Sequence, residues 1–104
     1  MNVQFKKGVL DLCVLSLLDG HDRYGYELVQ VISGMISVSE GSVYTVLRRL
    51  TKEGYFDTYQ QESTEGPPRK YYRMTDAGKK YLTELLTDWR EFNQKINELI
   101  GGMD

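Results

Sequence analysis

Two β-favouring runs enclosed by helical patterns constrain the fold of this chain most. Residues 55–62 and 69–74 are rich in aromatic and β-favouring side chains, and residues 63–68 between them contain Gly66, Pro67 and Pro68. This arrangement is typical of a two-stranded hairpin with an ordered tip. Helical patterns on both sides predict the order helix, helix, helix, strand, strand, helix. The chain is therefore expected to be α+β, and a hairpin after a three-helix unit is expected to form a wing.

Three helices are predicted before the hairpin. Apolar residues recur at helical spacing over residues 7–18, and Gly20 ends that run. A second, short pattern begins with Tyr24 and ends near Gly34, and residues 35–38 are expected to form a turn. The third helix follows Ser39, whose hydroxyl suits an N-cap, and reaches Gly54, which suits a left-handed C-terminal cap.

The last helix is long and carries an apolar stripe. Thr75 is expected to cap it, and its apolar residues are Leu82, Leu85, Leu86, Trp89, Phe92, Ile96 and Leu99. A chain of 104 residues has a thin core, so dimerisation is a natural way to cover such a stripe. We expect a single domain over residues 1–104, with a winged-helix unit over 5–74 and a dimerisation helix over 75–100.

The charge balance gives only weak information about partners. Thirteen basic and fifteen acidic residues give a net charge of −2, which argues mildly against nucleic acid. However, residues 39–74 hold six basic and five acidic groups, so the middle third is positive. A basic face on this segment is compatible with an acidic surface elsewhere.

Several classes of function lack the residues that they need. Cys13 is the only cysteine, so no intramolecular disulfide forms, and a reducing cytoplasm fits best. His21 is the only histidine and has no second nitrogen ligand for a metal. We find no catalytic constellation and no phosphate-binding glycine loop, so we expect no enzyme activity, metal or cofactor. Asp11 interrupts the apolar stretch 8–18, and no run is long enough to span a membrane.

The third helix has two contrasting faces. Val43, Val46, Leu47 and Leu50 share one arc, which is expected to pack on the core. The opposite side carries small, hydroxyl and basic groups, with Tyr44 and Arg49 at its shoulders; its members are Gly41, Thr45, Arg48 and Lys52. Such a row suits a helix in a DNA major groove, with Arg and Thr near base edges and Tyr and Lys at phosphates. The alternative is an ordinary solvated face.

Basic residues also follow the hairpin tip. Arg69, Lys70 and Arg73 would neutralise phosphates if the wing lies along the DNA backbone. On their own they fit a solvated strand edge equally well. The eight tyrosines also allow a stacking platform for single strands, but most occupy core or strand positions.

Three segments resemble the PadR family of transcriptional regulators. They are Leu10–Leu28 with its run Tyr24-Gly25-Tyr26-Glu27-Leu28, then Ser42–Gly54, and then Pro68–Gly78. The resemblance covers nearly the whole chain and belongs to the short subfamily with one C-terminal helix. It implies a winged helix-turn-helix repressor that is dimeric through its last helix. Tyr44 matches the DNA-contacting tyrosine of the family, and Arg69 and Lys70 match its basic wing.

Trp89 admits two interpretations. It either packs in the dimer or resembles the paired tryptophans of multidrug-responsive members, which flank a flat apolar ligand. In the second case Leu12, Leu86 and Asn93 would be its neighbours around a planar aromatic effector.

The sequence predicts a cytoplasmic homodimer that represses transcription by binding pseudo-palindromic operator sites in double-stranded DNA. The expected DNA-binding residues are Ser42, Tyr44, Thr45, Arg48, Arg49, Lys52, Arg69 and Lys70. The alternative is an effector-binding or protein-docking dimer without operator binding.

Overall fold

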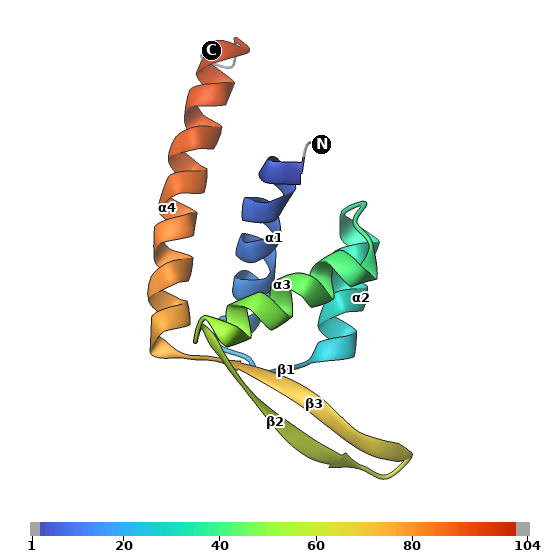
Figure 1. Cartoon of the computed structure of the whole chain (residues 1–104). Helices are drawn as coiled ribbons and strands as arrows, with labels where there is room; N and C mark the ends of the chain where they lie inside the picture. Colours follow the sequence, from blue (N-terminus) through green and yellow to red (C-terminus); the bar gives the residue numbers. More distant parts are fainter. Residues whose placement is uncertain (1–2, 102–104) are drawn as a thin grey trace.

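The computed structural model describes residues 3–101 and contains four helices and three strands in that range. In chain order these are α1 (Val3–Leu18), β1 (Arg23–Tyr24), α2 (Gly25–Met35), α3 (Glu40–Lys52), β2 (Phe56–Ser63), β3 (Gly66–Met74) and α4 (Asp76–Leu99). Figure 1 shows the β2–β3 hairpin extending from the helices at the end opposite to the C-terminus. The predicted α+β winged helix with a long last helix is confirmed.

The sheet has one strand more than the sequence predicted. The two-residue strand β1 pairs antiparallel with β3, so the strand order is β1-β3-β2. Tyr24, which was expected to begin the second helix, lies in this strand opposite Tyr71. A two-residue strand is too short to show an alternating pattern, so the periodicity of the following helix hid it.

The hairpin is longer than expected and its turn is tighter. β3 begins at Gly66, so Gly66, Pro67 and Pro68 belong to the strand rather than to the tip. A register shift between Gln61 and Ser63 accommodates the pairing of Ser63 with Gly66. The prolines are tolerated because they lie at the exposed start of a strand.

Helix termini follow the predicted capping residues. The Ser39 hydroxyl accepts a hydrogen bond from the Ser42 amide at 3.1 Å, and the Thr75 hydroxyl accepts one from the Gly78 amide at 3.1 Å. Gly54 adopts a φ of 85° after α3, the left-handed conformation expected there. Both ends of α3 are therefore defined by local sequence.

The core lies where α1, α2 and α3 meet the sheet and the first turns of α4. The predicted inward residues Val43, Val46, Leu47 and Leu50 are buried. On α2 the buried residues include Val29, whereas Val31 is 43% exposed. Leu82 is the last buried residue of α4, and Leu85 and Leu86 pack partly against the core, so the stripe from Trp89 onward is not covered by it.

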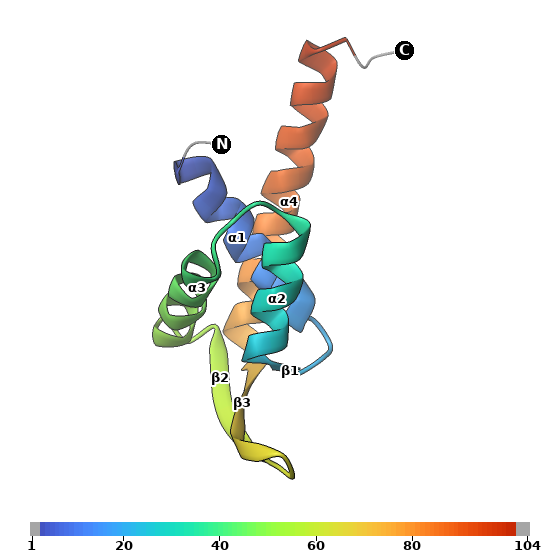
Figure 2. The same ribbon diagram turned by 90° about the vertical axis from the view of Figure 1, so that its right-hand side faces the viewer.

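α4 projects beyond the rest of the molecule. The principal extents are 55 × 28 × 23 Å, and the two views in Figures 1 and 2 show the C-terminal half of α4 extending past the helical body. Trp89, Phe92 and Leu99 on this half are 37%, 48% and 82% exposed. The stripe is thus available to a partner surface.

Candidate nucleic-acid interface

The outward face of α3 presents the row that the sequence predicted. Thr45, Arg48 and Lys52 are exposed, as are Gly41 and Ser42 near the start of the helix. The Thr45 hydroxyl donates to the Gly41 carbonyl at 2.9 Å and accepts from Arg48 Nη2 at 3.2 Å. These bonds hold the Arg48 guanidinium along the helix while leaving it open to solvent.

Tyr44 lies at the edge of this face and is half-buried. Burial raises the pKa of its hydroxyl, and the negative charge of Glu40 one turn earlier raises it further. The hydroxyl therefore keeps its proton at neutral pH and can donate a hydrogen bond to a phosphate oxygen.

Arg49 differs from the other predicted DNA contacts on α3. Its guanidinium pairs with the buried carboxylate of Asp11 on α1, and Nη1 lies 3.6 Å from Glu53 Oε1. Burial lowers the pKa of Arg49, but the hydrogen bond and charge of Asp11 outweigh it and hold the pKa above its ordinary value. The charge of Arg49 is thus balanced inside the protein, in contrast to Arg48 and Lys52.

Strand alternation separates Lys70 from the other two basic residues of the wing, Arg69 and Arg73. Tyr72 faces the core, so Lys70 shares its side of β3, and the Lys70 ammonium lies 5.5 Å from the Tyr72 ring centroid. Burial raises the pKa of Tyr72, and the positive charge of Arg48 opposes that rise. Lys70 therefore lies on the core-facing side of the wing, whereas Arg69 and Arg73 alternate to the other side.

Arg69 lies on the outer face of the wing. Its guanidinium carbon is 5.0 Å from the Tyr24 ring centroid, and the Arg73 guanidinium carbon is 5.5 Å from that of Tyr59. Tyr71 stacks between the two rings, with centroids 5.9 Å from Tyr24 and 5.6 Å from Tyr59. This row of stacked tyrosine rings and guanidinium groups was not predicted from the sequence, although the alternation of Arg69, Tyr71 and Arg73 indicates a shared face.

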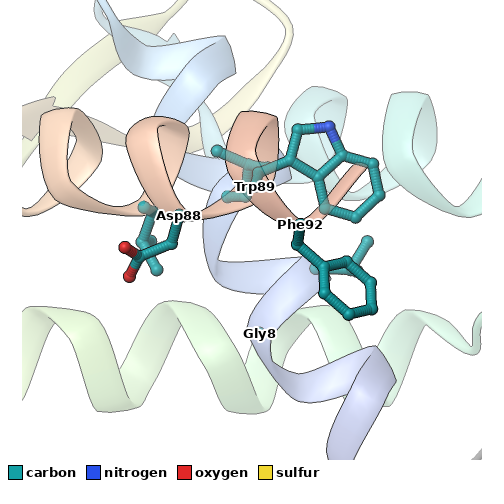
Figure 3. A pocket seen from close by; sticks show the side chains of 7 residues that line it. Gly8, Asp88, Trp89 and Phe92 are labelled. Atoms are coloured by element: carbon teal, nitrogen blue, oxygen red, sulfur yellow. The ribbon is translucent and has the colours of Figure 1, made fainter. Parts of the chain in front are cut away.

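Of the three residues predicted to surround Trp89, one lines the cavities beside it. Two cavities of about 270 and 380 Å³ adjoin Trp89, and Leu12 lines both. Figure 3 shows the Trp89 and Phe92 side chains extending from α4 beside Gly8 of α1. Leu86 and Asn93 line neither of these two cavities, because Leu86 packs against the core and Asn93 points to solvent at an exposed position.

The remaining candidate groups show no sign of catalytic or metal chemistry in the described part of the chain. Burial raises the pKa of the half-buried Cys13 thiol, which disfavours a reactive thiolate. No group of three or more His, Cys, Asp or Glu side chains within residues 3–101 could hold a metal ion. None of the described helices is both long and apolar enough to cross a membrane.

Comparison with known proteins agrees with this geometry. The model of the transcriptional regulator PadR-like family matches residues 14–84. The chain is 31% identical over 100 residues to a transcriptional regulator of Mycobacterium tuberculosis, covering 95% of this chain and 90% of the relative.

Solved structures give the same result. A PadR-like transcriptional regulator from Bacillus cereus is 37% identical, with a TM-score of 0.82 over 94% of this chain and 97% of that chain. A transcriptional regulator from Streptococcus is 31% identical, with a TM-score of 0.85 over 96% of this chain and all (100%) of that chain. These proteins are described as regulators of transcription and not as enzymes.

Proposed function

This chain belongs to the PadR-like family of transcriptional regulators, and on that premise we propose that it is a dimeric repressor that binds a pseudo-palindromic operator through α3 and the wing. The observation that carries the proposal is the exposure of Arg48 on the outward face of α3 and of Lys70 on the wing. One is suited to base edges in the major groove and the other to the adjacent backbone.

The exposed row on α3 supports a division of labour. Arg48 and Thr45 lie on the exposed face of α3, and their side chains are of the types that hydrogen-bond base edges in a major groove. Ser42, Tyr44 and Lys52 lie toward the two ends and shoulders of the row, where phosphates flank the groove. Arg49 contributes through the position of α3, because its guanidinium is engaged by Asp11.

The two faces of the wing would contribute differently. Lys70 shares the side of Tyr72 and is free to neutralise a phosphate, whereas Arg69 sits over Tyr24 on the outer face. Arg69 reaches a phosphate only by leaving that ring, so its contribution is expected to be smaller than that of Lys70.

Gel-shift titration against the DNA upstream of the chain's own gene tests the proposal. The selected duplex is the segment of this DNA that the wild-type protein binds most tightly. We expect Arg48→Ala to weaken binding to it by about 1–3 kcal/mol and to reduce the discrimination against duplexes with changed bases. Lys70→Ala is expected to weaken binding to all duplexes about equally and to lower the salt slope by about one unit.

Arg90→Ala on the exposed surface of α4 is the matched control and should leave both affinities unchanged. If Arg48→Ala and Lys70→Ala also bind with unchanged affinity at moderate salt, the exposed face of α3 is only solvated. The alternative of an effector-binding or protein-docking dimer without operator binding would then hold.

The cavities beside Trp89 favour a second, regulatory function. We propose that a planar aromatic effector stacks near Trp89 and relieves repression, since both cavities are lined almost entirely by apolar side chains. An effector that prefers the DNA-free dimer lowers operator affinity by the same factor by which DNA lowers effector affinity, typically about 5- to 150-fold.

Trp89 reports on this binding because the chain has one tryptophan. Titration with a panel of flat aromatic cations, with and without operator, should quench its fluorescence, and Trp89→Ala should lose the binding. Absence of quenching across the panel, or undiminished dye binding by Trp89→Ala, would assign Trp89 to dimer packing instead.

A further inference from the structure

A buried carboxylate joins three helices near the base of α4. Asp11 on α1 is 3% exposed, and its two oxygens accept hydrogen bonds from different elements. Oδ1 accepts from Arg49 Nη2 on α3, and Oδ2 accepts from the Tyr81 hydroxyl on α4 at 2.8 Å. We call these three residues the polar joint.

Further contacts bind the first turns of α4 to the end of α3. The Thr75 hydroxyl donates to the Gly54 carbonyl at 2.7 Å, and the Thr75 amide donates to the Tyr55 carbonyl at 3.1 Å. The Tyr81 ring stacks on the Tyr55 ring with centroids 4.6 Å apart and planes 21° from parallel. The base of α4 is therefore attached to the segment that directly follows α3.

The polar joint has little freedom to adopt a second geometry. An ionised carboxylate at this depth is stable only while both oxygens keep their partners, because an unpaired buried charge costs several kcal/mol. Burial raises the pKa of Tyr81 and the hydrogen bond to Asp11 raises it further, so the phenol keeps its proton and continues to donate. A rotation of α3 against α4 would break one of these two bonds.

We propose that Asp11, Arg49 and Tyr81 are positioning residues that fix the angle between α3 and α4 and thereby set operator affinity without touching DNA. This inference rests on the proposed function, in which α3 enters the major groove. Because the distal half of α4 carries the exposed apolar stripe, an error in the angle at its base changes where a dimer places its two recognition helices.

Tyr81→Phe is the most selective test. It removes the hydroxyl that donates to Asp11 and keeps the ring that stacks on Tyr55. Tyr55→Phe is the matched control, because it retains the same stack and the Tyr55 hydroxyl makes no hydrogen bond within the described residues. Thermal unfolding of both variants establishes that each is folded at the temperature of the binding assay.

The affinities of the folded variants for the selected upstream duplex and for a random duplex are then compared. We expect Tyr81→Phe to weaken binding to the selected duplex by about three- to tenfold, with affinity for the random duplex and the salt slope unchanged. A residue that only stabilises the fold would leave both affinities of the folded protein as they are. Unchanged affinity, or equal loss on both duplexes, would overturn the proposal.

A double-mutant cycle with Arg48→Ala sharpens this result. If Tyr81 acts by orienting α3, the effect of Tyr81→Phe on the selected duplex should shrink once Arg48 no longer reads bases. Full additivity would contradict positioning.

Residual dipolar couplings of the DNA-free protein give an arm that does not depend on operator binding. We expect Tyr81→Phe, and not Tyr55→Phe, to rotate α3 relative to α4. An unchanged orientation would refute the polar joint even if operator binding is confirmed. Wild-type protein that selects no duplex contradicts the proposed function, and the couplings still decide whether the polar joint holds the angle.

Discussion

At the residue scale, the ion pair of Asp11 and Arg49 is the polar contact whose loss is expected to lower stability most directly, because the Asp11 carboxylate is buried. The carboxylate is 4% exposed at its side chain and the guanidinium 28%, so solvent compensates poorly for a lost partner. We expect Arg49→Met to lower the free energy of unfolding by about 2 to 3 kcal/mol, as for a lost hydrogen bond to a buried charge. Urea unfolding measures this, with Arg48→Met, at an exposed position, expected within about 0.5 kcal/mol of wild type.

Tyr81 gives stability a dependence on alkaline pH. Its pKa is raised above the ordinary value of 10.0, chiefly by burial and also by Asp11. Because the pKa is higher in the folded state, protonated Tyr81 makes its full contribution to the free energy of unfolding below about pH 10. That contribution is lost as the pH rises above this value. Between about pH 9 and about pH 11, wild type should lose more stability than Tyr81→Phe. Chemical denaturation measures the free energy of unfolding of both proteins across this pH range. If that free energy falls equally in both, the pH dependence belongs to other tyrosines.

The residues of the polar joint show what local sequence signals cannot reveal. Asp11 was visible only as a charge that interrupts an apolar helix, which signals a buried partner but not its identity. The partners lie 38 and 70 residues away, at Arg49 and Tyr81. The spacing on α3 correctly placed Arg49 on the shoulder of the exposed face, but only the tertiary fold shows that its guanidinium turns to Asp11.

At the scale of elements, Gly78 permits the close approach of α4 to the segment after α3. A Cβ at this position would collide with the Tyr55 carbonyl oxygen and lie 2.9 Å from Met74 Cγ. We therefore expect Gly78→Ala to destabilise the fold by about 1–3 kcal/mol, although alanine favours helix. Gly34→Ala on α2, where nothing lies within 4 Å of the added Cβ, is the control and should stabilise by up to about 1 kcal/mol. Equal effects in thermal unfolding would contradict the packing argument.

Most elements could be predicted because their signals are local. Capping hydroxyls at Ser39 and Thr75, the left-handed Gly54 and the two faces of α3 all follow from spacings of a few residues. β1 could not be predicted, because its two residues gain their strand character only by pairing with β3. The separation of Lys70 from Arg69 follows from strand alternation, but which of them shares the core-facing side depends on the burial of Tyr72.

At the scale of the whole molecule, the length of α4 exceeds what the core of this chain covers. Its 24 residues span about 36 Å, whereas buried side chains on it end at Leu82. The stripe beyond that point adjoins the two apolar cavities near Trp89. An exposed apolar surface of this extent on a small domain marks an interaction site, which supports self-association.

Charges placed on this stripe test the assembly without disturbing the core. Ile96 is half-buried and Leu99 is 82% exposed in the single chain, so Ile96→Glu with Leu99→Glu should fold and yet fail to dimerise. Sedimentation at micromolar concentration should show a monomer whose operator affinity falls steeply, because one recognition helix reaches only one half-site. Gln94→Glu with Asn97→Glu adds the same charge at the same spacing on the opposite side of α4 and should remain dimeric. A stable wild-type monomer, or a stripe variant that still dimerises, would contradict a dimer that binds two half-sites through α4. The angle between α3 and α4 would then not set the spacing of two recognition helices.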